Sequence, residues 1–424
     1  MIEKISAINN IINSFVWGPY MLVFLMGTGV YISIRTYFFQ VKNFNIWAKL
    51  TYGSMFDKHE KGHNITPFQA VSVALASTIG IGSIAGIATA IVSGGPGALF
   101  WMVVSAFFGM MTKFSEVVLS VYFREKDEKG IHYGGPMYYI EKGLKQKWLS
   151  ILFAIFAAIA TFGAGNMTQS NAIAGLLKQT IKLPEYVSGI IVAIIVALVL
   201  IGGIKRISSV SEKLVPFMAT IYFIASIIIL IINFKNIPQA IKLIVSEAFS
   251  LKSAASGITG YAIFIAMRYG IARGVFSNEA GLGTAPIAHT ASNTNNPIKQ
   301  GMWGIFEVFN TLIICLLTGL VIISSDLYLY GNTAADGAVL TSLAFKEAIG
   351  IIGEIVITIS SILFAFSTII GWSYYGETCL GYLTKRNKIV IMSYKIIFII
   401  IIVIGATSDL KSVWAIADTF NGLM

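Results

Sequence analysis

Residues 74–86 read Ala-Leu-Ala-Ser-Thr-Ile-Gly-Ile-Gly-Ser-Ile-Ala-Gly, and residues 269–283 read Tyr-Gly-Ile-Ala-Arg-Gly-Val-Phe-Ser-Asn-Glu-Ala-Gly-Leu-Gly. Each stretch interrupts a long apolar segment with several glycines, each of which weakens a helix by about 1 kcal/mol relative to alanine. Irregular backbone at membrane depth is tolerated only where it is buried in protein or lines a cavity. The two stretches therefore predict two discontinuous helices around an internal site.

The composition places these stretches in a membrane protein. Of the 424 residues, 56% are apolar and 12% are charged, and the mean hydropathy is +0.78. A soluble domain carries about 25% charged residues, so a soluble enzyme is excluded. Apolar runs of about 20 residues recur along the chain and predict transmembrane helices. The candidate spans are 14–37, 66–93, 96–123, 149–177, 184–203, 208–233, 257–285, 299–325, 351–376, 387–407 and 411–424.

Basic residues indicate the orientation of the chain. If the N-terminus lies outside, the inner loops carry eighteen Lys and Arg residues and the outer segments carry eight. This bias supports an external N-terminus and accounts for the net charge of +10 without nucleic acid. Segments 237–252 and 337–349 do not suit a span, and we expect them to form amphipathic helices on the outer face. Because 411–424 is too short to cross, we infer that the chain ends inside its final helix.

The spacing of the two interrupted spans predicts the architecture. They stand five spans apart, and matching breaks in two halves of a chain indicate a secondary transporter. Because five is odd, the second half inserts in the opposite direction. We predict an all-α membrane protein of about eleven transmembrane helices, a five-plus-five inverted repeat with one extra N-terminal helix and two discontinuous helices. Its parts are 1–65 (extra helix and inner linker), 66–233 (first repeat) and 234–424 (second repeat, opened by an outer amphipathic helix). The alternative is that the glycines serve close helix packing alone.

Several motifs in this order resemble the alanine/glycine:cation symporter family, the sodium:alanine symporters. The most specific runs from Arg273 to Pro286. The others are Asn13-Ser-Phe-Val-Trp-Gly-Pro19, Gly94-Gly-Pro-Gly97, Gly134-Gly-Pro-Met-Tyr138, Gly165-Asn-Met167, Val215-Pro-Phe-Met218 and Gly371-Trp-Ser-Tyr-Tyr-Gly-Glu377. The resemblance implies a leucine-transporter-type fold and uptake of alanine or glycine with sodium, or sometimes protons, at a prokaryotic cell membrane.

The chain departs from the family pattern at two places. Where the family usually reads Gly-Thr-Gly-Asn, this sequence has Gly80-Ile-Gly-Ser83, which removes one hydroxyl and shortens one oxygen ligand. Where the family often has Asp-Thr, this sequence has Asn310-Thr311. These departures bear on the choice of ion and substrate.

A zwitterionic amino acid needs donors for its carboxylate, acceptors for its ammonium group and a small apolar pocket. Backbone N–H groups freed between Gly80 and Ser83 suit a carboxylate at a half-helix N-terminus. Carbonyls from Gly270 to Arg273, where we place the second break, suit the ammonium group. Amides in span 4 either face the cavity or join helices. The predicted substrate-binding residues are Thr78, Gly80, Ile81, Gly82, Ser83, Met167, Gln169, Asn171, Gly270, Phe276, Phe364, Thr368 and Trp372.

The resemblance also implies a sodium site. By analogy with the leucine-transporter fold, the ion is held by the carbonyls of Ala76, Ile79 and Phe364 and the hydroxyls of Ser367 and Thr368. The i, i+3, i+4 spacing places the last three on one helix face. The alternative is that the two hydroxyls bond to their own helix, as Ser and Thr often do in membranes.

Acidic residues inside spans are functional candidates. We expect Glu279 to pair with Arg273 or Arg268 and so to fix the broken helix, in preference to transferring protons. Glu307 has no partner within its own span, which makes it the candidate for proton coupling.

The sequence therefore predicts a symporter that imports alanine or glycine with co-transported sodium by alternating access, and no enzyme activity or organic cofactor. Its predicted partners are the amino acid and the bilayer, without nucleic acid. A proton-coupled symporter, or one for another small solute, is the alternative. An ion channel is disfavoured because no selectivity-filter repeat is present, and a membrane enzyme because no catalytic constellation is present.

Overall fold

The computed structural model describes the chain except for residues 1–8, 10, 11, 14, 56–63, 129, 250–258, 326 and 328–336. The first half contains α2 (Pro19–Arg35), α3 (Phe39–Lys42), α4 (Phe44–Thr51), η1 (Tyr52–Ser54), α5 (Pro67–Thr78), η2 (Ile81–Ser83), α6 (Ala85–Gly94), α7 (Gly97–Tyr122), α8 (Pro136–Gly143), α9 (Lys147–Phe162), the π-helical turn η3 (Gly163–Met167), α10 (Thr168–Ile181), α11 (Glu185–Leu200) and α12 (Gly203–Ile232).

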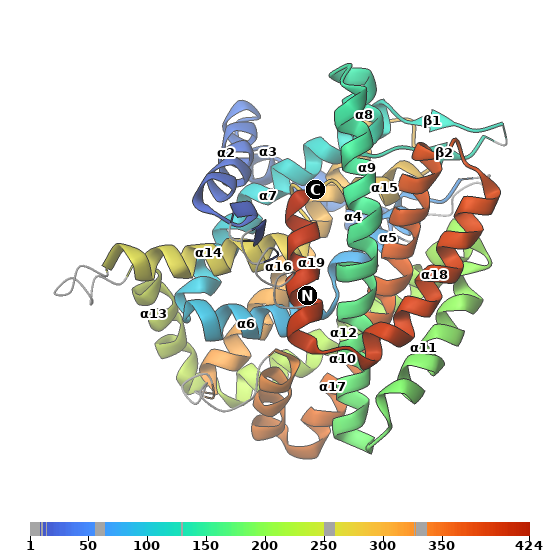
Figure 1. Cartoon of the computed structure of the whole chain (residues 1–424). Helices are drawn as coiled ribbons and strands as arrows, with labels where there is room; N and C mark the ends of the chain where they lie inside the picture. Colours follow the sequence, from blue (N-terminus) through green and yellow to red (C-terminus); the bar gives the residue numbers. More distant parts are fainter. Residues whose placement is uncertain are drawn as a thin grey trace.

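The second half is also helical. It contains η4 (Phe234–Asn236), α13 (Ile237–Ala248), α14 (Thr259–Asn278), α15 (Ala285–Thr290), α16 (Pro297–Ser324), α17 (Ala338–Leu383), α18 (Lys388–Thr407) and α19 (Leu410–Leu423). A short antiparallel hairpin of β1 (Glu125–Lys126) and β2 (His132–Tyr133) lies beside α8 at one end of the bundle (Figure 1).

In the part of the chain that the structure describes, each predicted span overlaps one or more helices. Within the described residues, six helical segments are long and apolar enough to cross a membrane, and α2, α6 and α11 are shorter apolar helices. The six are 97–122, 147–181, 203–232, 297–324, 338–383 and 388–407. Isoleucines on α11 and α18 remain exposed, as expected for faces that meet lipid. The prediction of an all-α membrane protein is confirmed.

The first interrupted helix breaks where the glycines predicted. A capping box of Thr66 and Gln69 begins α5, and α5 ends at Thr78. Ile79 leaves the helical region at φ −84° and ψ 67°, and Gly80 is extended. A 3₁₀ turn then leads into α6. The end of α5 and the start of α6 are thus separated by the irregular segment from Ile79 to Ile84.

The second interrupted helix breaks about ten residues later than predicted. Gly270 and Arg273 lie inside α14, so the expectation that their carbonyls are freed is wrong. The irregular segment runs from Glu279 to Thr284, where Gly281 and Gly283 have φ of +96° and +72°. Gly270 serves packing instead, because a Cβ there would meet Ala98 and Trp101 of α7.

The two predicted amphipathic segments are helical but pack against the bundle. The helix α13 buries Ala240, Ile244 and Ala248, and the range 250–252 lies outside the described residues. The segment 338–348 forms the first part of α17, which kinks at Ile349 and Gly350. Its Phe345 is fully buried whereas Lys346 and Glu347 are exposed, so one face of this part packs into the core.

Candidate functional site

A small closed cavity lies at the break between α5 and α6. Its volume is about 10 Å³, which is the room that one water molecule requires. Seven of the thirteen predicted substrate-binding residues line it. The lining residues are Ser77, Thr78, Gly80, Gly82, Ala164, Gln169, Phe276, Glu279, Thr368, Trp372 and Asn421. The sequence analysis missed Ser77, Ala164 and Asn421, because nothing in their local pattern distinguishes them from packing residues.

Gln169 connects the break to the neighbouring helices. The N–H of Ile81 donates to Oε1 of Gln169 at 3.3 Å, and Nε2 of Gln169 donates to the carbonyl of Ala164 at 3.0 Å. The amide oxygen therefore occupies the position at a half-helix N-terminus that suits an anion. Gly80 lies so close to Thr368 that a Cβ would overlap the threonine hydroxyl.

Four oxygen atoms from α5 and α17 converge beside this cavity. The hydroxyl of Ser367 donates to the carbonyls of Ala76 at 3.1 Å and Phe364 at 2.9 Å. The hydroxyl of Thr368 donates to the same two carbonyls, each at 3.0 Å. Each hydroxyl therefore bonds both to its own helix and across to α5, as the back-bonding alternative expects in part, and the sodium site stays a prediction. Carbonyl and hydroxyl oxygens are the ligands found around sodium at broken helices.

Two further predicted residues, Ile79 and Phe364, have side chains that point away from the small cavity. Ile79 lines a cavity of about 350 Å³ between α5, α12 and α16. The ring of Phe364 packs against Tyr222 with a centroid distance of 5.4 Å, so its carbonyl faces the oxygen cluster and its side chain does not line the small cavity.

Ser83 belongs to a separate polar cluster. Its hydroxyl lies 2.7 Å from that of Ser277, which lies 3.2 Å from the thiol of Cys315. The carbonyl of Ser83 accepts a hydrogen bond from Thr318 at 2.9 Å. Ser83 is therefore fully buried beside α14 and α16 and does not line the small cavity, contrary to expectation.

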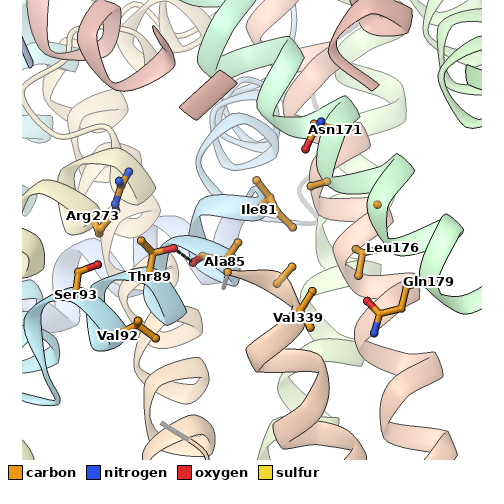
Figure 2. Close-up of a pocket in the computed structure, with 14 residues that line it drawn as sticks. Ile81, Ala85, Thr89, Val92, Ser93, Asn171, Leu176, Gln179, Arg273 and Val339 are labelled. Atoms are coloured by element: carbon orange, nitrogen blue, oxygen red, sulfur yellow. Dashed lines mark hydrogen bonds between the residues drawn. The ribbon is translucent and has the colours of Figure 1, made fainter. Parts of the chain in front are cut away.

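A larger cavity of about 310 Å³ adjoins α6, α10, α14 and the start of α17. Figure 2 shows Thr89 and Ser93 on α6, Leu176 and Gln179 on α10, and Arg273 on α14 around it. Ile81 and Asn171, predicted to bind substrate, line this cavity and not the small one. Nδ2 of Asn171 donates to the carbonyls of Gly405 and Ser408, so it also joins α10 to the end of α18.

Met167, also predicted to bind substrate, packs against α18. Its Cα and Cβ face Gly405 of α18, so close that a Cβ on Gly405 would meet them. Met167 lines neither the small cavity nor the larger one.

An ion pair lies at the edge of the larger cavity, where Arg273 sits 5.7 Å over the ring of Phe276, a residue that lines the small cavity. Nη1 and Nη2 of Arg273 each lie 2.8 Å from a carboxylate oxygen of Asp418 in α19. The carbonyl of Asp418 accepts a hydrogen bond from Trp17 at 3.1 Å. The predicted ion pair between Glu279 and Arg273 is therefore wrong. Glu279 instead accepts a hydrogen bond from Thr284 at 2.5 Å.

A buried charged network lies under the second break. Nζ of Lys113 is 3.5 Å from Oε1 of Glu307 and donates to the carbonyl of Glu279 at 3.0 Å. Nε2 of His289 lies 2.9 Å from Oε2 of Glu307, and Gln300 bonds to the other ring nitrogen at 2.8 Å. Lys113, Glu307 and His289 are completely buried. Glu307, which has no partner in its own span, is thus paired from α7 and α15.

Solved structures show which fold this arrangement represents. A Na⁺-coupled sialic acid symporter in a substrate-bound outward-open state superposes with a TM-score of 0.54 and 16% identity, covering 93% of this chain and 81% of that chain. The likeness establishes the fold. The chain therefore has the leucine-transporter-type fold, with interrupted segments between α5 and α6 and between α14 and α15.

The chain belongs to the sodium:alanine symporter family, whose model matches residues 2–424. It is 44% identical over 421 residues to the sodium/alanine symporter AgcS of Methanococcus maripaludis, covering 98% of this chain and 91% of that protein. It is 34% identical over 425 residues to the probable sodium/glutamine symporter GlnT of Bacillus subtilis, covering 100% of this chain and 87% of that protein. The predicted family and the prediction of a transporter instead of an enzyme are confirmed.

Family membership establishes the general activity. The protein is a multi-pass membrane protein that transports an amino acid together with sodium.

Proposed function

We propose that the protein imports alanine and glycine with sodium by alternating access. The observation that carries the proposal is the convergence of the Ala76 and Phe364 carbonyls with the Ser367 and Thr368 hydroxyls beside the break. In the bound state the two hydroxyls turn their lone pairs to the ion. Sodium then replaces hydrogen bonds that already join α5 to α17.

The substrate binds in the small cavity at the break. Its carboxylate displaces the amide oxygen of Gln169 from the N–H of Ile81, because both groups offer the same acceptor. Phe276 and Trp372 enclose its side chain, which limits the cargo to small residues. A cavity of about 10 Å³ has no room for alanine, so binding must move these elements apart.

The larger cavities give this movement a direction. One adjoins α6 and the other adjoins α5, so they lie on opposite halves of the first broken helix. With the N-terminus outside, the cavity at α6 is external and the cavity at α5 is internal. Residues 66–233 and 234–424 act as the two inverted repeats. Opening each cavity in turn to the small one produces alternating access.

The departures from the family pattern at Ile81 and Ser83 favour, as the alternative, a different substrate or a different coupling ion. Ile81 and Ser83 depart from the usual family residues, and a relative at 34% identity is a probable sodium/glutamine symporter. A proton-coupled mechanism would use Glu307, the buried carboxylate between Lys113 and His289.

Uptake of labelled L-alanine into proteoliposomes tests the proposal. We expect accumulation under an inward sodium gradient, competition by unlabelled glycine, and no accumulation when choline replaces sodium. Accumulation under a proton gradient without sodium would establish the alternative ion. Sodium-driven uptake of glutamine, with none of alanine or glycine, would contradict the proposed cargo.

A further inference from the structure

A cavity of about 720 Å³ lies away from the transport site, at the end of the bundle that carries α8. It is enclosed by the β1–β2 hairpin, the turn between α11 and α12, the end of α17 and the turn before α18. The hairpin is at the upper right of Figure 1. Under the proposed orientation this end faces the cytoplasm, where the inner lipid leaflet meets water.

Basic side chains from three of these segments line the cavity: Lys126, Lys205, Arg386 and Lys388. None of the four forms an ion pair with another described residue. Arg386 lies over the ring of Tyr133 and donates to the hydroxyl of Tyr138 at 3.4 Å. The guanidinium group is thereby oriented while its charge remains uncompensated.

The acidic residues of the cavity do not cancel this charge. Glu377 pairs with Lys395 at 3.0 Å, which neutralises it from outside the cavity. Asp127 accepts a hydrogen bond from the N–H of Ile131 at 2.8 Å and so closes the hairpin. Glu128 is exposed. The four cations that line the cavity therefore outnumber its three carboxylates, one of which is paired outside it, and the cavity keeps a positive excess.

Two buried hydroxyl groups, those of Tyr374 and Thr378, line the cavity together with the basic residues. Tyr374 is 3% exposed and Thr378 is 2% exposed, and both line the cavity one helical turn apart on α17. The two side chains lie close to each other, and neither hydroxyl makes a hydrogen bond of normal geometry to a described residue. Buried polar groups are generally satisfied, so these two need explaining.

We propose that this cavity binds a phosphate-bearing anion, either an anionic lipid headgroup or a soluble phosphate compound. Lys and Arg side chains recognise phosphate by charge and by directed hydrogen bonds. The hydroxyls of Tyr374 and Thr378 would donate to its oxygens. Because the ligand joins the hairpin to the ends of α11 and α17, its binding stabilises the folded transporter.

Thermal unfolding of the purified full chain tests this site with two probes. Inorganic pyrophosphate is added in detergent, against chloride at matched ionic strength. Separately, nanodiscs containing phosphatidylglycerol are compared with nanodiscs of phosphatidylcholine alone. The variants are Arg386→Gln and the double variant Tyr374→Phe/Thr378→Val, which removes both hydroxyls while preserving side-chain shape. The control is Lys145→Gln, an exposed lysine at the same end that does not line the cavity.

We expect one probe to raise the melting temperature of the natural chain and of Lys145→Gln, with an apparent affinity about tenfold weaker in the hydroxyl double variant. A response to pyrophosphate assigns a soluble phosphate compound, and a response to phosphatidylglycerol alone assigns a lipid headgroup. The absence of any shift, or an equal shift in every variant, overturns the proposal. The double variant keeps the test valid if Arg386→Gln does not fold, and the readout is independent of amino-acid uptake.

Discussion

Thr368 is the residue on which the proposed ion site depends most directly. Its hydroxyl contacts carbonyls on both α5 and α17, and its side chain also lines the substrate cavity. A single hydroxyl therefore serves both proposed ligands. Gly80 lies directly against this hydroxyl, and any larger residue at position 80 would overlap it.

We expect Thr368→Val to weaken sodium binding because it removes one oxygen ligand and preserves shape. Hydrogen bonds to charged groups contribute about 1.5–3 kcal/mol, so the sodium concentration for half-maximal alanine uptake should rise about tenfold or more. The matched control is Thr358→Val on the same helix, a buried threonine outside the cavity. Equal sodium dependence in the two variants would remove Thr368 from the ion site.

At the scale of elements, two polar contacts hold α14 near its C-terminal end. The Arg273–Asp418 pair ties it to α19, and the Lys113 contact to the carbonyl of Glu279 ties its end to α7. The two glycines with positive φ lie between this anchor and α15. These two glycines can absorb backbone rotation if α14 moves during transport.

The ion pair between α14 and α19 should control access to the substrate cavity. We expect Asp418→Asn to open it from the side of the larger cavity, because Arg273 lines that cavity and contacts the ring of Phe276, which lines the small one. A cysteine introduced by Ala164→Cys lines the small cavity, and the native Cys315 and Cys379 are buried. Labelling of that cysteine by a polar thiol reagent should accelerate several-fold in Asp418→Asn.

The control for this experiment is Glu185→Gln, which breaks the exposed pair with Lys178. Exposed ion pairs contribute little, so labelling should not change. If Asp418→Asn labels no faster than this control, the Arg273–Asp418 pair does not restrict access.

The network around Glu307 predicts a stability effect. Removing one partner of a buried ion pair costs about 3–5 kcal/mol, because the remaining charge is uncompensated. We expect Glu307→Gln to lower the melting temperature of the purified protein, and the double variant Lys113→Met/Glu307→Leu to recover most of the loss. Sodium-driven uptake by the double variant would show that Glu307 is structural. Loss of uptake in a double variant with native stability would instead support a role in coupling.

The breaks show how far sequence patterns can predict such elements. The first break was found because Gly80 and Gly82 coincide with the irregular backbone. The second was placed too early because Gly270 serves packing against α7, whereas Gly281 and Gly283 provide the positive φ. A glycine's role depends on its neighbours in space, which local sequence does not specify.

The hydrogen-bond and ion-pair partners of the site residues also depend on the fold and not on local sequence. The pairing of Ser367 and Thr368 with Ala76 followed from a resemblance that implied the fold. The pairing of Arg273 with Asp418 joins segments separated by 145 residues and was missed. Arg273 and Arg268 are the basic residues nearest to Glu279 in the sequence, but the carboxylate of Glu279 bonds to Thr284 in the fold.

At the scale of the whole molecule, the two proposed ligands meet at one break. The ion cluster and the substrate cavity share Thr368, and both adjoin the unwound segment between α5 and α6. Each ligand therefore pre-organises groups that the other contacts. The coupling between them is then a property of the bundle, because it requires α5, α6 and α17 to move together.

This arrangement predicts reciprocal coupling. Sodium should tighten alanine binding, and alanine must tighten sodium binding by the same factor, because the two pathways share one thermodynamic cycle. Calorimetric titration of the purified protein with alanine, in sodium and in choline at equal ionic strength, measures the first factor. Titration with sodium, with and without alanine, measures the second. We expect a factor of about ten in each, and Thr368→Val should reduce both together. Equal alanine affinity in sodium and choline would mean that the two ligands do not share the break.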